Sequence, residues 1–278
     1  MSNESIHIDV DKLLRTKLPK YYRYIPKAVI RWLARTICQD ELNALLEHNA
    51  GKEGCEFAAS ALVYLGVSVK VSGIENLPAD AGSRLVFASN HPLGGLDGIA
   101  LISQLGAHYG GKIKCVVNDM LMQVSPLAKL FLPANKHGRQ SEEAVRAINE
   151  AFAGDDQMLY FPAGLCSRRM KGGEIADLEW KKSFIVKSVE YHRDVVPVYF
   201  SGQNSDFFYK FASWRKRIGM KLNIEMIYLP GEVFKSRGKE FNIIIGKPIP
   251  WQTFTGGRRP SEYAAEVRAA VYELKPEN

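Results

Sequence analysis

Short apolar runs of strand length alternate with helix-like segments along most of the chain. The helix-like segments cover residues 97–105, 141–152 and 178–192. The strand candidates are a period-two alternation of valines over 67–71 and the runs 84–88, 113–117, 158–161, 195–200, 223–228 and 241–245. Strands separated by helices of about 10–15 residues imply βαβ units. The pattern predicts an α/β fold: one domain with a mainly parallel central sheet flanked by helices.

Length and composition leave room for this fold and exclude several other classes. At 278 residues and 46% hydrophobic content, the chain can bury a core without disulfides or metals. Its four cysteines never form a C-x-x-C pair, which argues against a structural zinc site and favours a reducing compartment. The N-terminus does not resemble a secretory signal, and no apolar run is long enough to span a bilayer. We expect a cytoplasmic protein.

The N-terminal part of the chain is strongly basic. Between Lys12 and Gln39 there are eight basic residues and no acidic one, within a formal net charge of +7. Lys27, Arg31 and Arg35 recur every four residues and share one face of a predicted helix. A basic amphipathic helix is typical of elements that lie on an anionic membrane, although a solvated helix face or a nucleic-acid surface has the same charge pattern. We expect residues 1–54 to form a helical extension and residues 55–278 the α/β domain.

One stretch carries the residues of a general base. The apolar strand 84–88 is followed by His91, and Asp97 comes six residues later at the start of a predicted helix. Ligands of open α/β sheets sit beyond the carboxyl ends of strands, where His91 falls. A carboxylate on one ring nitrogen fixes the imidazole tautomer and leaves the other nitrogen basic. The alternative is that His91 is an ordinary loop residue and Asp97 a helix N-cap.

Four blocks of sequence, in order, resemble those of the glycerolipid acyltransferases, the PlsC-like lysophospholipid acyltransferase superfamily. Asn90 and His91 followed by an Asp resemble the N-H-x4-D signature, and residues 161–168 (FPAGLCSR) resemble the F-P-E-G-T-x-S-R block. Residues 132–139 (LPANKHGR) take the place of a block that ends in Arg, and residues 196–198 (VPV) resemble a fourth block. The resemblance covers roughly residues 67–249.

The resemblance implies acyl transfer from a thioester, acyl-acyl carrier protein or acyl-CoA, to a lysolipid hydroxyl, with no metal and no cofactor beyond that co-substrate. His91 is then the base, Asp97 its partner, and Arg139 and Arg168 ligands for the acceptor's anionic group, since guanidinium groups suit carboxylate and phosphate. The other residues that the matched blocks assign to substrate binding are Asn90, Phe161, Pro162, Gly164 and Ser167.

The chain departs from the family pattern at two places. Five residues, not four, separate His91 from Asp97, and Ala163 stands where the third block has Glu. In the family that Glu is associated with binding glycerol phosphate, so its absence argues against lysophosphatidic acid as acceptor. Similar variants occur among hemolysin-like bacterial sequences and among the O-acyltransferases of aminolipids such as ornithine and glycine lipids. We therefore expect a lyso-aminolipid acceptor, which has a hydroxyl and a carboxylate but no glycerol phosphate.

Two other interpretations stay open on the sequence. The changed spacing and Ala163 are compatible with a catalytically silent lipid- or acyl-carrier-binding protein of the same fold. A segment of interleaved aromatic and basic residues at 206–217 could lie at a lipid interface, pack as an ordinary helix, or bind single-stranded nucleic acid. Without a recognised nucleic-acid motif we expect no nucleic-acid partner, and we place the protein on the inner face of the membrane as a peripheral protein.

Overall fold

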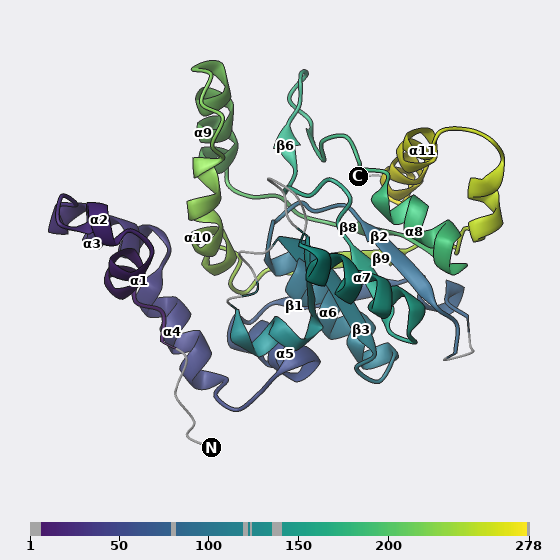
Figure 1. Ribbon diagram of the computed structural model, residues 1–278, viewed down its shortest axis with the longest axis horizontal. Coiled ribbons are helices and arrows are strands. Elements are labelled where there is room, and N and C mark those ends of the chain that lie inside the picture. Colours follow the sequence, from purple (N-terminus) through teal and green to yellow (C-terminus); the bar gives the residue numbers. More distant parts are fainter. Residues whose placement is uncertain (1–6, 79–81, 119–121, 123, 135–140, 277–278) are drawn as a thin grey trace.

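The central sheet matches the predicted class. The computed structural model describes residues 7–78, 82–118, 122, 124–134 and 141–276 (Figure 1). Seven strands form one sheet in the order β1-β9-β8-β2-β5-β3-β4, and every neighbouring pair is parallel except β8 with β9. A separate two-stranded antiparallel hairpin joins β6 to β7. The strands are β1 Ser68–Ser72, β2 Leu85–Ser89, β3 Ile113–Asn118, β4 Phe131–Ala134, β5 Gln157–Tyr160, β6 Arg168–Arg169, β7 Ile175–Ala176, β8 Asp194–Phe200 and β9 Glu240–Ile245.

Helices cover both faces of the sheet. Strand β2 shows why both faces are closed: Leu85 and Phe87 belong to one buried apolar cluster, and Val86 and Ala88 to a second. The first cluster includes side chains of α5 and α6, and the second includes side chains of α7, α8 and α11. A strand buried on both sides reads as a continuous apolar run, as this one does. The helices are α1 Val10–Lys17, α2 Pro19–Tyr22, α3 Lys27–Thr36, α4 Gln39–His48, α5 Gly54–Tyr64, α6 Leu96–His108, α7 Glu142–Ala153, α8 Ser183–Tyr191, α9 Asp206–Arg217, α10 Leu229–Phe234 and α11 Pro260–Glu273.

The sequence-based elements agree with the structure except at a few positions. Residues 223–228 were expected to form a strand, but Ile224–Tyr228 form a 3₁₀ helix that leads into α10. The side chain of Glu225 within it is fully buried among charged partners, which an apolar period-two pattern does not anticipate. Helix α8 begins at Ser183 rather than at residue 178, and the short strands β4, β6 and β7 were not foreseen.

The N-terminal helices α1 to α3 project to one side of the layered part of the molecule (Figure 1). Their eight basic side chains are all solvent-exposed, and so are Tyr21, Tyr24 and Trp32. Ile30 is the buried residue of α3. Among the described residues, no helix is long and apolar enough to cross a membrane.

Candidate active site

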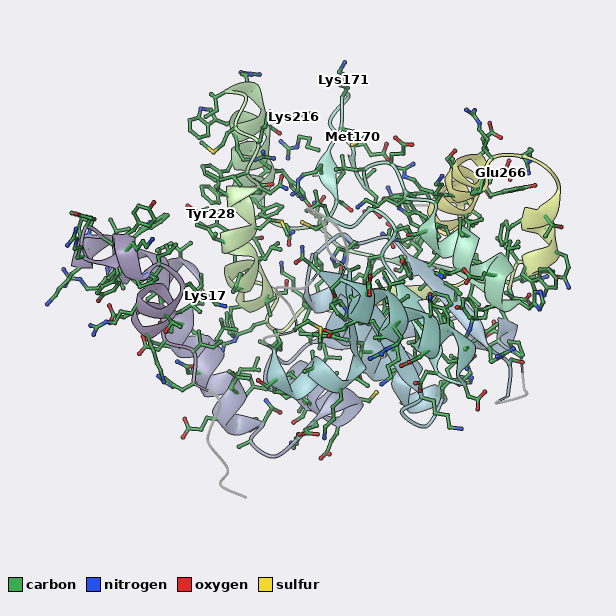
Figure 2. The ribbon with its side chains drawn as sticks, in the orientation of Figure 1. Lys17, Met170, Lys171, Lys216, Tyr228 and Glu266 are labelled. Carbon is green, nitrogen blue, oxygen red and sulfur yellow. The ribbon has the colours of Figure 1, made fainter. Side chains whose placement is uncertain are left out.

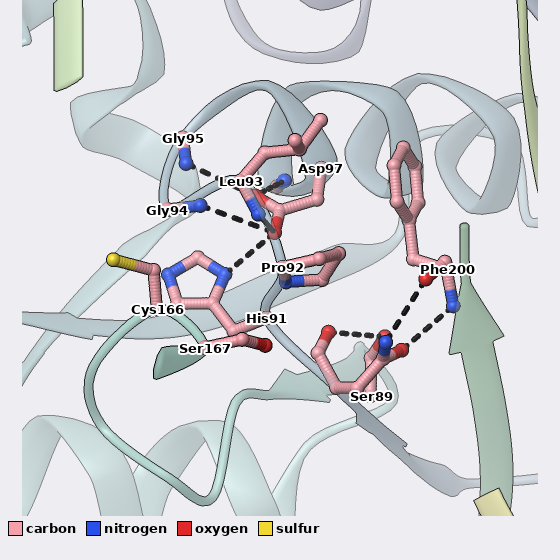
Figure 3. A network of polar contacts seen from close by, with 12 residues as sticks. Ser89, His91, Pro92, Leu93, Gly94, Gly95, Asp97, Cys166, Ser167 and Phe200 are labelled. Carbon is pink, nitrogen blue, oxygen red and sulfur yellow. Dashed lines mark hydrogen bonds and ion pairs between the residues drawn. The ribbon is translucent and has the colours of Figure 1, made fainter. Parts of the chain in front are cut away.

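His91 and Asp97 form a hydrogen-bonded dyad at the carboxyl end of β2. His91 Nδ1 lies 3.0 Å from Asp97 Oδ2 (Figure 3). Asp97 is fully buried in the first turn of α6, whereas the His91 side chain keeps 17% of its exposed area. Nε2 of His91 has no hydrogen-bond partner among the described residues. The imidazole therefore has one nitrogen fixed by a carboxylate and a second one free, as a general base requires.

The longer spacing between the two residues is absorbed by the loop backbone. Gly94 takes the left-handed conformation, with φ of 76°, which glycine adopts without a steric penalty. The loop curls around the Asp97 carboxylate, which accepts backbone N–H bonds from Leu93 (2.9 Å), Gly94 (3.3 Å), Gly95 (3.0 Å) and Gly98 (2.9 Å). A Cβ at position 94 would lie 2.9 Å from Cβ of Cys166, so a side chain there meets the facing loop.

The pKa values of the dyad move apart. Burial lowers the pKa of His91, but the charge and hydrogen bond of Asp97 outweigh it, and the net pKa is raised above the ordinary value. Burial raises the pKa of Asp97, but the His91 charge and the hydrogen bonds from His91, Leu93 and Gly98 outweigh it, so its pKa is lowered. Asp97 is thus an anion that stabilises a protonated His91, which is the state reached after proton abstraction.

The block 161–168 faces the dyad from the end of β5. The ring of Phe161 lies against the His91 imidazole, with centroids 4.2 Å apart. The Ser167 N–H donates to the His91 carbonyl at 2.8 Å. Pro162 and Ala163 are buried, and Gly164 is exposed with φ of 64° in the turn that its N–H closes onto the Phe161 carbonyl. The block therefore forms one wall of the site.

Asp177 is a functional candidate that sequence reasoning missed. Its fully buried carboxylate accepts hydrogen bonds from the His91 N–H (3.2 Å), the Ser167 hydroxyl (2.6 Å) and the Trp180 indole (3.0 Å). Burial raises its pKa, and these hydrogen bonds act against that rise. Asp177 thus connects the dyad loop with the facing block, and it lies 86 residues from His91 in the sequence. No local sequence motif marks it.

Asn90 and Ser167 use their polar atoms within the protein. The Asn90 amide donates to the Phe200 carbonyl at 2.9 Å and accepts from the Phe200 N–H at 2.7 Å, which extends the pairing of β2 with β8 (Figure 3). Asn90 and Ser167 are only 3% and 2% exposed. In this geometry they position the neighbouring His91, and their predicted role in substrate binding stays a prediction.

Arg168 belongs to a buried ion cluster in the block that faces the dyad. Its guanidinium lies 2.8 Å from Glu225 Oε1 and donates to the Cys166 carbonyl at 2.7 Å. Glu225 Oε2 lies 2.7 Å from Nε of Arg215, so one buried carboxylate serves two arginines. Arg168 also lies over the ring of Phe208. The other arginine that the sequence assigned to the acceptor, Arg139, lies outside the described residues.

Two nearby side chains complete the site. Cys166 is fully buried beside the dyad loop, and burial raises the pKa of its thiol to about 11, so it stays protonated at neutral pH and is a poor acyl acceptor. Lys181 is exposed beside Gly164, with Nζ 3.5 Å from the point where a Cβ on Gly164 would lie. Among the described residues, no three His, Cys, Asp or Glu side chains gather closely enough to hold a metal ion.

Comparison with known proteins adds to this geometry. The family described as Acyltransferase matches residues 12–277. The chain belongs to this acyltransferase family. A lyso-glycine lipid O-acyltransferase of Bacteroides thetaiotaomicron is 50% identical over 275 residues, which cover 99% of this chain and all of that protein. A protein of the same name from Phocaeicola vulgatus is 48% identical over 275 residues, covering 99% of this chain and 98% of that one.

The acyltransferase also resembles a solved structure in its fold. The 1-acyl-sn-glycerophosphate (LPA) acyltransferase PlsC from Thermotoga maritima superimposes with a TM-score of 0.50 at 19% identity, over 96% of this chain and 94% of that one. The likeness confirms the predicted fold class.

Proposed function

We propose that this acyltransferase moves a fatty acyl group from a thioester donor to the hydroxyl of a lyso-aminolipid of the glycine-lipid type. The observation that carries the proposal is the His91–Asp97 dyad, with Nε2 of His91 free at the carboxyl end of β2. A weakly acidic alcohol needs a positioned base, whereas a thioester already carries a good leaving group. The dyad supplies the base.

The reaction follows from these groups. Neutral His91 takes the hydroxyl proton of the acceptor on Nε2 while the hydroxyl oxygen attacks the thioester carbonyl. The new C–O ester bond forms, the C–S bond breaks, and the proton on His91 passes to the departing thiolate. Asp97 stabilises the imidazolium between these steps. General-base assistance of this kind contributes typically about 10²–10⁴-fold.

The acceptor class is supported by the residues next to Gly164. Ala163 is 7% exposed within an apolar cluster, so no carboxylate stands where the third family block has Glu. Lys181 places an exposed cation beside Gly164. An acyl-glycine acceptor presents a hydroxyl for His91 and a carboxylate for such a cation. The names and high identity of the two lyso-glycine lipid relatives support the same acceptor.

The donor and the place of reaction form the finer part of the proposal. The formal charge of +7 suits the acidic surface of acyl carrier protein and the phosphates of CoA alike, so transfer from both donors should be measured side by side. The exposed basic and aromatic side chains of α1–α3 would hold the enzyme on the anionic inner face of the membrane.

An acceptor panel tests the proposal. Purified enzyme receives radiolabelled acyl donor with lyso-glycine lipid, lyso-ornithine lipid or lysophosphatidic acid in mixed micelles. We expect label in the glycine-lipid product, and we expect Lys181→Gln to raise KM for that acceptor with little change in kcat, whereas the exposed control Lys112→Gln has no effect. Transfer to lysophosphatidic acid alone contradicts the acceptor. Intact donor binding without transfer to any acceptor favours the silent binding protein.

A further inference from the structure

The far end of α9 and the turn after it carry apolar side chains that the fold leaves uncovered. We call residues 214–222 the α9 tip. Within it Trp214 is 52% exposed, Ile218 51%, Met220 37% and Leu222 73%. Single exposed apolar residues are ordinary on a soluble protein, but four within nine residues form a patch that needs a partner.

The charges of the α9 tip indicate what the partner is. Lys216, Arg217 and Lys221 are all exposed, and the tip contains no acidic residue. Cations interleaved with a tryptophan and long aliphatic side chains match a bilayer surface, where anionic headgroups lie above acyl chains. Binding to a protein partner would not by itself explain why basic and apolar side chains alternate in the α9 tip.

The side of α9 that leads to the tip continues the aromatic surface. The rings of Phe207 and Phe211 stack with centroids 5.9 Å apart, and those of Phe211 and Trp214 with centroids 5.7 Å apart. With Lys210 these rings line an open hollow of about 420 Å³. Aromatic rings and a lysine ammonium are the side chains that sit well at the headgroup level of a membrane.

The β6–β7 hairpin beside α9 adds to the same side of the molecule. Arg169 of β6 forms an ion pair with Asp206 at the start of α9. Figure 2 shows Lys216 near the end of α9 and Lys171 at the end of the hairpin, projecting in the same direction, with Met170 just below Lys171. An apolar and a basic side chain thus occupy the hairpin end as well.

Both ends of α9 are tied to the loops of the active site. At the far end, Arg215 binds the Met220 carbonyl (2.6 Å) and shares buried Glu225 with Arg168 of the block facing the dyad. Just before the helix begins, the Asn204 side chain donates to the carbonyls of Pro92 and Leu93 in the dyad loop, at 3.4 and 3.3 Å. These contacts link the α9 tip to both loops of the site.

We propose that the α9 tip is a membrane-docking element that enters the headgroup region of an anionic bilayer. It is a second attachment point beside the N-terminal helices, and the Arg215–Glu225–Arg168 cluster links it to the block that faces the dyad. The bilayer is the natural source of a lysolipid acceptor, so docking here presents the site to its substrate. The inference concerns binding and does not depend on the proposed acyl transfer.

The experiment measures the partition of the full chain onto vesicles of 70% phosphatidylethanolamine and 30% phosphatidylglycerol. The double variant Ile218→Ser/Leu222→Ser should lower the partition coefficient by about tenfold, because these apolar side chains no longer enter the bilayer. The matched control is Val63→Ser on α5, which removes a side chain that is 78% exposed and far from the tip in sequence, and should leave partition unchanged. Equal partition of the double variant and the control would overturn the proposal.

A second readout reports on Trp214 itself. In a Trp32→Phe background, which removes the exposed tryptophan of α3, brominated lipids should quench fluorescence, and the further change Trp214→Phe should abolish that quenching. Quenching that is the same with and without Trp214 contradicts insertion. If Lys216→Gln/Lys221→Gln weakens binding to acyl carrier protein while vesicle binding is unaffected, the tip is a donor-docking surface and the proposal fails. Acyl transfer in micelles, measured for every variant, shows separately whether the proposed activity holds.

Discussion

The two loops that meet at the active site are held in different ways. In the loop from Asn90 to Asp97, the carboxylate of Asp97 is bound by groups at most six residues away. In the facing block, Arg168 depends on Glu225, which lies 57 residues away in sequence. Ser167 binds Asp177, and the same carboxylate binds His91 of the first loop, 86 residues from Asp177. The Asp97 carboxylate is therefore bound within its own loop, whereas the Arg168 guanidinium depends on a carboxylate that a distant segment supplies.

This contrast predicts different failures when each loop is broken. Replacing Asp97, whose carboxylate the first loop surrounds, should remove catalysis while the sheet and helices stay folded. Losing a long-range partner of the second block should lower the stability of the fold and disturb catalysis as a consequence.

The largest effect is expected from Asp97→Asn. The neutral amide cannot stabilise the imidazolium, and its NH₂ group faces backbone donors, so kcat should fall by about 10³-fold, within the range that general-base assistance contributes. Steady-state kinetics with the glycine-lipid acceptor checks this, and Asp155→Asn at an exposed position is the control. A fall in kcat of less than tenfold would show that catalysis does not depend on the Asp97 carboxylate.

Glu225→Gln should have the next largest effect, and chiefly on stability. It leaves Arg168 and Arg215 buried without their shared carboxylate, which costs about 3–5 kcal/mol in the free energy of unfolding. Urea denaturation measures the cost. If Arg168 acts only through Glu225, then Arg168→Gln and Glu225→Gln change KM for the acceptor equally. A rise in KM confined to Arg168→Gln would support its predicted contact with the acceptor's anionic group.

Asp177→Asn should affect both properties to a smaller extent. The amide can accept one of the three hydrogen bonds but brings donors toward Ser167 and His91, so we expect a loss of about 1–3 kcal/mol in stability. The His91 backbone should shift as well and lower kcat by roughly tenfold. Denaturation and kinetics on the same preparation separate the two effects. Full activity with reduced stability would show that Asp177 supports the fold without positioning His91.

The smallest expected effect is a shift in the pH dependence of kcat/KM that the raised pKa of His91 causes. Activity requires neutral His91, whose pKa is raised, so the acid limb of kcat/KM should lie above the ordinary value of about 6.5.

The stability contributed by protonated His91 is fully present below about pH 6.5 and is lost as pH rises through its folded pKa. That of Asp97 is present above about pH 3.9 and is lost as pH falls through its lowered pKa. Activity should therefore increase over the range in which the His91 contribution to stability disappears. A limb at or below pH 6.5 contradicts the raised pKa.

The features that the sequence predicted are those that depend on contacts between residues close together in the chain. The strand β2, the turn at Gly94 and the approach of Asp97 to His91 depend on neighbours along the chain, so composition and spacing indicated them. Asp177 carries no motif, and its role exists only because the end of β2, the block after β5 and the segment before α8 converge. Likewise, nothing near Arg168 in the sequence indicates Glu225, so the buried ion cluster was not foreseen. The strand expected at 223–228 is wrong for the same reason. The predicted role of Arg168 as a ligand for the acceptor's anionic group stays a prediction.

The most direct test is transfer of labelled acyl groups to lyso-glycine lipid by the wild-type chain and by His91→Ala, followed as formation of the ester product under single-turnover conditions. If His91 is the base, the wild-type chain forms the ester and His91→Ala is slower by roughly 10³-fold, with donor and acceptor binding intact. An ester formed by His91→Ala within tenfold of the wild-type rate would contradict the role of the dyad.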